Sequence, residues 1–167
     1  MSFLESGDNR FIIGGKGAGT VRRILFVCTG NTCRSPMAEA ILRSKKVEGM
    51  EVRSAGVFAA NGSEASAHAK SVLDANRIPH QHSSSLLTNE TVDWAELILT
   101  MTASHKEAIK RAYPGAAVKL FTLKEFTGEA VDRDVVDPFG GNLAMYQETF
   151  YELDGLIDKA LKKLGSL

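Results

Sequence analysis

The stretch Val27–Pro36, which reads VCTGNTCRSP, decides the fold expected for this chain. The residues before it, Ile24–Val27, form an apolar run typical of a buried strand. The residues after it, Met37–Arg43, have the composition of a helix. Ser35 stands where a helix N-cap residue is expected, and Pro36 where the first helical residue is expected. The stretch is therefore predicted to be a turn that joins a strand to a helix.

A thiol opens this loop at Cys28 and a guanidinium closes it at Arg34, with five residues between them. A strand-to-helix turn directs unpaired backbone N–H groups and the positive end of the helix dipole at one point. Five residues are enough to curl around one phosphoryl group, with Arg34 holding two of its oxygens and Cys28 beneath the phosphorus. The positive surroundings favour the thiolate, which is a nucleophile. The predicted phosphate-binding residues are Thr29, Gly30, Asn31, Thr32, Cys33 and Ser35.

A cysteine at a strand end is more often a small buried apolar residue, and a Cys-x₅-Arg spacing also occurs by chance. The combination of strand, glycine-bearing loop, arginine, serine, proline and helix favours the catalytic interpretation. Asn31 tolerates positive φ and is expected to hold the loop's shape. Ser35 is expected to cap the helix and to donate a hydrogen bond towards the Cys28 thiolate.

The loop, together with Asp137-Pro138-Phe139-Gly140, resembles the signature of the low-molecular-weight protein tyrosine phosphatases. Within that family it is most similar to the bacterial protein-arginine phosphatases, which carry threonine where Thr32 stands. The resemblance covers about residues 23–164. It implies that Cys28 is the nucleophile, that Asp137 is the general acid and later activates water, and that Phe139 lines the substrate entrance. It also implies that His82, three residues after Pro79, steadies the loop asparagine.

The acid role of Asp137 has an independent chemical argument. A phenolate or guanidine leaving group departs poorly unless it is protonated, so a general acid is needed opposite the nucleophile. Asp-Pro sequences also simply begin turns, and from the residues alone the two interpretations are even. The family resemblance decides for the acid. Asp132 and Asp134 are expected to lie on a solvated face.

Thr32 is the basis for the predicted substrate. Many family members have an aliphatic residue at this position, which suits an aromatic ring, whereas a threonine hydroxyl suits a planar polar guanidinium. In the resembling arginine phosphatases it also helps to place the hydrolytic water. We therefore expect a protein phosphatase that hydrolyses phosphoarginine through a thiophosphate-enzyme intermediate. Phosphotyrosine is the alternative substrate, and Thr32 could also be a plain loop residue.

Cys33 could be a small filler of the loop or a resolving thiol that captures oxidised Cys28 as a reversible disulfide. The family behaves in the second way, so redox regulation is expected. An arsenate reductase on this fold would need further cysteines downstream, and none follows Cys33. A non-catalytic phosphate-binding module would not need an acid, so the presence of Asp137 argues against it.

Composition limits the other functions. The 167 residues carry 20 Lys and Arg against 20 Asp and Glu, so no bulk charge favours nucleic acid or an acidic membrane. Long apolar runs and a signal core are missing, and two cysteines form no disulfide scaffold, which together predict a cytoplasmic protein. Clustered metal ligands are lacking, so neither metal nor cofactor is expected. The expected partners are phosphorylated proteins and, by resemblance, an opposing protein arginine kinase.

Residues 1–21 are predicted to be a flexible extension, and residues 22–167 a phosphatase domain. Gly14–Thr20 is rich in glycine but fits neither nucleotide-binding glycine motif. Apolar patterns after the loop predict strands near 50–55, 95–101 and 118–121, and helices near 36–46, 65–75, 91–94, 103–112 and 143–164. This alternation predicts a single α/β domain of three layers, with a four-stranded parallel sheet flanked by helices. The loop would then lie at the carboxyl edge of the sheet, where such folds bind ligands.

Overall fold

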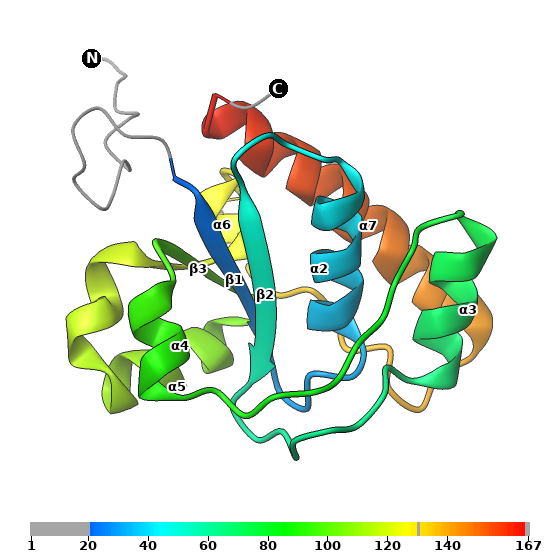
Figure 1. Cartoon of the computed structure of the whole chain (residues 1–167), viewed down its shortest axis with the longest axis horizontal. Helices are drawn as coiled ribbons and strands as arrows, with labels where there is room; N and C mark the ends of the chain where they lie inside the picture. Colours follow the sequence, from blue (N-terminus) through cyan, green and yellow to red (C-terminus); the bar gives the residue numbers. More distant parts are fainter. Residues whose placement is uncertain (1–20, 130, 166–167) are drawn as a thin grey trace.

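The computed structural model describes residues 21–129 and 131–165. Within them one four-stranded sheet, whose strands all run parallel, forms the centre of the molecule (Figure 1). The strand order is β2-β1-β3-β4. The strands are β1 (Arg23–Cys28), β2 (Glu51–Gly56), β3 (Leu97–Thr100) and β4 (Leu120–Thr122). The helices are α2 (Arg34–Ser44), α3 (Ala67–Ala75), α4 (Asn89–Trp94), α5 (Ala103–Ala112), η2 (Pro114–Lys119), α6 (Leu123–Phe126) and α7 (Leu143–Lys163).

The helices form one layer on each face of the sheet (Figure 1). Alternate residues of β1 divide between the two layers, because successive side chains of a strand point to opposite faces. Ile24 and Phe26 pack with residues of α2, α3 and α7, whereas Leu25 and Val27 pack with residues of α4 and α5. Each such fully buried side chain contributes about 1.5–3 kcal/mol through its removal from water. Both faces of β1 are therefore buried, which makes it a rigid support for the loop that follows it.

The prediction of an α/β domain with a four-stranded parallel sheet covered on both faces is confirmed. The fourth strand was predicted two residues too early, because Val118 and Lys119 belong to the 3-10 helix η2 and the strand begins at Leu120. The short helix α6 was not predicted. Residues 1–20 of the predicted extension lie outside the described residues, while Val21 is buried in the core.

The carboxyl ends of the strands lie at one edge of the sheet, and the loop that joins β1 to α2 lies there. Cys28 is the last residue of β1 and stands opposite Gly56, the last residue of β2. The connection from β3 to α5 begins at the same edge. No helix among the described residues has both the length and the apolar character needed to cross a membrane.

Candidate active site

Cys28 is buried at the end of β1, and its Sγ lies 2.8 Å from Ser35 Oγ. The prediction that Ser35 caps the helix is wrong. The helix α2 begins at Arg34, Cys33 occupies the N-cap position, and the described structure has no side-chain cap there. Ser35 is the second helical residue, and its hydroxyl contacts Cys28 and Asn31 inside the loop. The prediction that it contacts the Cys28 sulfur agrees with the geometry.

Asn31 organises the loop from within. It is fully buried and has a φ of 58°, in the left-handed region that asparagine tolerates better than most residues. Its Nδ2 donates to Ser35 Oγ at 2.8 Å and to Ser54 Oγ at 2.9 Å, and its Oδ1 accepts from Ser85 N at 2.8 Å. Because Ser35 Oγ accepts from Asn31, its own proton is free to be donated to Cys28 Sγ.

His82 and Glu39 support this network from the outside. The ring Nε2 of His82 lies 2.7 Å from the carbonyl oxygen of Asn31. The hydroxyl of Ser54 donates to Glu39 Oε1 at 2.5 Å, which leaves its oxygen to accept from Asn31. His82, to which the family resemblance assigns the support of the loop asparagine, therefore contacts the backbone of Asn31. A chain of oriented hydrogen bonds runs from Glu39 on α2 to the sulfur of Cys28.

Most backbone carbonyl oxygens of the loop accept hydrogen bonds, whereas several of its N–H groups have no acceptor among the described residues. Four carbonyl oxygens of the loop accept hydrogen bonds from neighbouring segments: Cys28 from Val57 N, Thr29 from Phe58 N, Asn31 from His82 and Thr32 from Ser66 N. In the part of the chain that the structure describes, the backbone N–H groups of residues 30–33 have no acceptor. Successive N–H groups left free in a loop form a concave site for an anion.

Arg34 adds a charged donor to the same site. The side chain is only 5% exposed, its Nη1 donates to Val135 O at 2.9 Å, and its Nη2 lies 3.3 Å from Asp137 Oδ2. The Nε is buried without a partner among the described residues. A buried unpaired donor is uncommon, and this one shares an edge of the guanidinium with Nη2. That edge could bind two oxygens of one phosphoryl group.

Asp137 faces this arginine from the segment that precedes α7. Its side chain is 48% exposed, and its Oδ1 accepts a hydrogen bond of 3.1 Å from Phe139 N. Phe139 is 75% exposed. These residues close a cavity of about 230 Å³, whose lining is Cys28, Thr29, Gly30, Thr32, Cys33, Arg34, Asp137 and Phe139. The cavity thus brings the candidate nucleophile, cation and acid together.

Cys33 packs against α7 and does not point into solvent. Its Sγ lies 3.2 Å from Tyr146 Oη of α7 and 3.5 Å from Ser66 Oγ. Burial, together with the hydrogen bond to Cys33, raises the pKa of Tyr146 to about 12. Both cysteines are free thiols.

Asp132 and Asp134 are exposed, as predicted, but each has a contact. Asp132 pairs with Lys124 at 2.8 Å, and Asp134 Oδ1 accepts from Ala103 N, the first residue of α5. Asp134 therefore fastens the Asp137 segment to the start of α5.

Sequence reasoning missed two residues of the site. Gly56 lies so close to the loop that a Cβ atom there would come within 2.4 Å of Thr29 O. His105, on α5, places its Nε2 2.8 Å from Thr29 Oγ1. Both lie far from the loop in sequence, so no local pattern indicates either contact.

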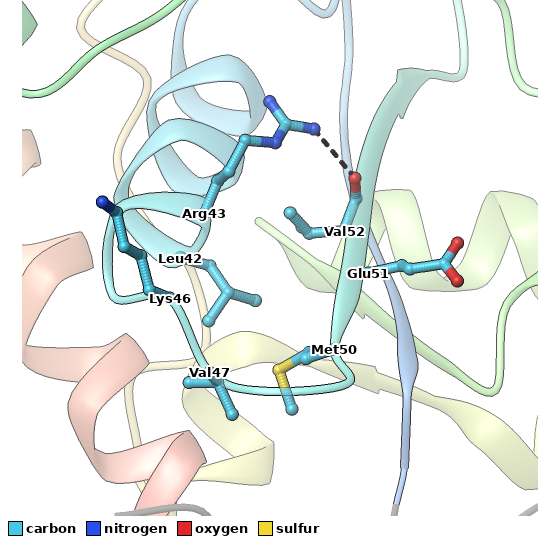
Figure 2. A pocket seen from close by; sticks show the side chains of 7 residues that line it. All are labelled: Leu42, Arg43, Lys46, Val47, Met50, Glu51 and Val52. Carbon is cyan, nitrogen blue, oxygen red and sulfur yellow. Dashed lines mark hydrogen bonds between the residues drawn. The ribbon is translucent and has the colours of Figure 1, made fainter.

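A second hollow, of about 340 Å³, lies between α2 and β2 at the other end of β2 from Gly56 (Figure 2). Its lining includes Arg43, which donates to Val52 O at 3.1 Å, but neither a cysteine nor a histidine. This hollow is larger than the cavity at Cys28, but its lining has no comparable set of nucleophile, arginine and acid. Among the described residues, no three His, Cys, Asp or Glu side chains are grouped so that they could hold a metal ion.

Comparison with known proteins agrees with this geometry. The Geobacillus stearothermophilus protein-arginine-phosphatase is 54% identical over 142 residues, which cover 85% of this chain and 95% of the relative. A Bacillus subtilis protein-arginine-phosphatase is 47% identical over 145 residues, covering 84% and 95%. The low molecular weight protein-tyrosine-phosphatase PtpB of Staphylococcus aureus is 40% identical over 137 residues, covering 82% and 95%.

Solved structures give the same result. The YwlE arginine phosphatase from Geobacillus stearothermophilus superposes with a TM-score of 0.84 at 53% identity, covering 86% of this chain and 93% of that one. A YwlE arginine phosphatase variant with serine in place of cysteine, whose active-site serine is phosphorylated, superposes with a TM-score of 0.82 at 43% identity, covering 86% and 95%.

The family assignment follows from both sequence and structure. The sequence model described as "Low molecular weight phosphotyrosine protein phosphatase" matches residues 23–166. The chain therefore belongs to the low molecular weight phosphotyrosine protein phosphatase family.

Proposed function

We propose that this protein is a protein-arginine phosphatase that uses Cys28 as its nucleophile and needs no metal or organic cofactor. One observation supports this most strongly. Gly30, Thr32, Cys33 and Arg34 line the same cavity as Cys28. In the described part of the chain the N–H groups of residues 30–33 have no acceptor, and the buried Nε of Arg34 has no partner. A phosphoryl group bound over Cys28 would satisfy these donors, which could stabilise the charge on its equatorial oxygens in the transition state.

In the first step the Cys28 thiolate attacks phosphorus, an S–P bond forms and the P–N bond of phosphoarginine breaks. The Ser35 hydroxyl, 2.8 Å from Cys28 Sγ, donates a hydrogen bond that stabilises the thiolate. It does the same when the sulfur leaves again in the second step. The proposal makes Ser35 an electrostatic support of the nucleophile, oriented by Asn31 and through it by His82.

Asp137 supplies the proton that the leaving nitrogen needs. In the present structure its carboxylate is paired with Arg34 at 3.3 Å. A bound phosphoryl dianion would replace the carboxylate as the partner of Arg34 and favour the protonated acid. After transfer of that proton, the Asp137 carboxylate takes a proton from water as the water attacks phosphorus. The S–P bond then breaks, and inorganic phosphate and the Cys28 thiolate are released.

Thr32 and Phe139 support phosphoarginine as the substrate. The half-buried Thr32 places a hydroxyl in the wall of the cavity, where a guanidinium could pack, and Phe139 forms an apolar side of the entrance. The relatives named protein-arginine-phosphatase share 54% and 47% of their aligned residues with this chain. Phosphotyrosine is the second candidate, because the exposed Phe139 ring could also stack on a phenyl ring and PtpB relatives are 40% identical.

The substrates in this proposal are phosphorylated proteins in the cytoplasm, and the opposing enzyme is a protein arginine kinase. Neither nucleic acid nor membrane takes part.

Cys33 is proposed as a resolving thiol. Hydrogen peroxide would oxidise the Cys28 thiolate to a sulfenic acid, which the Cys33 thiolate attacks with loss of hydroxide to form a disulfide. We expect Cys33→Ser to lose little activity but to be inactivated irreversibly by peroxide, whereas a dithiol restores the wild type. Equal recovery of both proteins would contradict this role.

The test of the proposed substrate compares turnover of a phosphoarginine peptide and a phosphotyrosine peptide in metal-free buffer, for wild type and Thr32→Ile. A strong preference for phosphoarginine that the substitution weakens or reverses would support the proposal and its determinant. A wild-type preference for phosphotyrosine would favour the second candidate. Turnover of neither peptide would contradict both.

A further inference from the structure

His105 is a buried titratable residue at the site for which the proposed reaction has no use. Its side chain belongs to α5 and is only 6% exposed. Its Nε2 lies 2.8 Å from Thr29 Oγ1, and its Nδ1 is buried without a hydrogen-bond partner in the described part of the chain. Burial, aided by the nearby charge of Arg34, lowers the pKa of His105 to about 4. The ring is therefore neutral near pH 7 and carries one N–H.

The position of that single proton decides the direction of the hydrogen bond to Thr29. If Nδ1 carried it, a buried N–H would be left without an acceptor, which is the rarer and more costly arrangement. If Nε2 carries it, the N–H is used by Thr29 Oγ1, and only a lone pair at Nδ1 is unpaired. His105 is therefore assigned as the donor to Thr29.

The consequence concerns the proton of the Thr29 hydroxyl. Because Thr29 Oγ1 accepts from His105, its own O–H is free to donate elsewhere. Thr29 is exposed and lines the cavity that also holds Cys28, Arg34 and Asp137. The bond from Phe58 N to Thr29 O holds its backbone, and the contact with His105 Nε2 holds its hydroxyl.

We infer that Thr29, a residue of the predicted phosphate-binding loop, donates a hydrogen bond to the phosphoryl group through its side-chain hydroxyl, and that His105 is the positioning residue that directs this hydroxyl. This deepens the proposed function, because it assumes that a phosphoryl group occupies the cavity. It does not depend on whether the leaving group is a guanidine or a phenol.

The experiment uses p-nitrophenyl phosphate turnover and competitive inhibition by inorganic phosphate, so that it is independent of the phosphoarginine assignment. A hydrogen bond to a charged group corresponds to about a tenfold effect or more. Thr29→Val and His105→Leu are each expected to lower kcat/KM about tenfold and to weaken phosphate inhibition similarly. Their combination is expected to lose no more than either alone, because both remove the same interaction.

His105→Gln is the matched conservative variant, because its amide can donate from near the place of Nε2. It is expected to recover most of the kcat/KM and phosphate inhibition that His105→Leu loses, which a merely space-filling role would not predict. His80→Leu and Thr91→Val, at sites away from the cavity, control for the loss of a histidine and of a hydroxyl. Ring nitrogen shifts of ¹⁵N-labelled wild type report the tautomer directly and do not depend on any variant folding.

The inference predicts a protonated Nε2 and a bare Nδ1 in that spectrum. A protonated Nδ1 would overturn it, as would a Thr29→Val protein with wild-type kcat/KM and wild-type phosphate inhibition. Losses that multiply in the double variant would also overturn it, since they would mean that the two side chains act separately. Failure to hydrolyse phosphoarginine peptides, with p-nitrophenyl phosphate turnover intact, would overturn only the proposed substrate.

Discussion

Replacing Gly56 with alanine is predicted to disturb the loop around Cys28 without altering any proposed catalytic group. Gly56 ends β2 beside Cys28, and a Cβ atom built on it would lie 2.4 Å from Thr29 O and 3.0 Å from Asn31 N. Both neighbours are backbone atoms, and Thr29 O is held in place by Phe58 N. The added methyl group can be accommodated only if the strand and the loop move apart.

The size of the effect follows from these distances. A Cβ contact shorter than 3.0 Å is not tolerated, so the gap must widen by at least about 0.6 Å. Forcing such a backbone shift in a packed region costs about 1–3 kcal/mol of unfolding free energy. Misplacing catalytic groups by about 1 Å lowers rates by about a hundredfold, so we expect kcat/KM to fall about tenfold or more.

The assay is urea unfolding together with kcat/KM for p-nitrophenyl phosphate. Gly155→Ala in α7 is the matched control, because its built Cβ has no neighbour within 4 Å apart from adjacent residues and the backbone of its own helix. Alanine there is expected to stabilise the helix by about 0.5–1 kcal/mol and to leave activity unchanged. A Gly56→Ala protein with wild-type stability and wild-type kcat/KM would refute the argument that close backbone approach fixes the loop.

Three further predictions test other parts of the site. Ser35→Ala removes the hydroxyl that faces the Cys28 sulfur and is expected to lower kcat about 10- to 100-fold in steady-state assays; an unchanged kcat would contradict its role. Asp137→Asn is expected to slow turnover of a phosphoarginine peptide about 10²- to 10⁴-fold. Turnover of p-nitrophenyl phosphate should fall much less, because nitrophenolate leaves without a proton. Equal losses with the two substrates would contradict the acid role of Asp137. In the folded protein the pKa of His105 is lowered from 6.5 to about 4, so between these pH values the unfolded chain binds more protons than the folded one. The free energy of unfolding of the wild type should therefore fall by as much as about 3 kcal/mol as the pH falls through this range. Urea unfolding of His105→Gln should show a smaller change in unfolding free energy over the same pH range. A change equal to that of the wild type would contradict the lowered pKa of His105.

The layered fold and the loop were predictable because their signals are local. The strand β1, the loop and α2 follow one another in sequence, and the apolar run of β1 is buried on both faces as a parallel strand requires. The helix α6 could also have been found, since Thr122 and Glu125 form a capping box of the usual spacing.

The remaining features arise from packing between distant segments. Serine is a residue type common at helix N-caps, but the contacts of the Ser35 hydroxyl with Cys28 and Asn31 form only when the loop has folded. Gly56 and His105 reach the loop from β2 and α5, and no spacing in the sequence indicates which of their atoms meet Thr29. Sequence patterns thus predict the candidate catalytic groups better than the groups that position them.

The central claim is that Cys28 carries the phosphoryl group during turnover. The most direct test mixes the protein with a phosphoarginine peptide, quenches the reaction within the first turnover and maps the modified residue by mass spectrometry. We predict one phosphoryl group, on Cys28. A phosphoryl group on any other residue, or turnover by Cys28→Ser at the wild-type rate, would contradict the account.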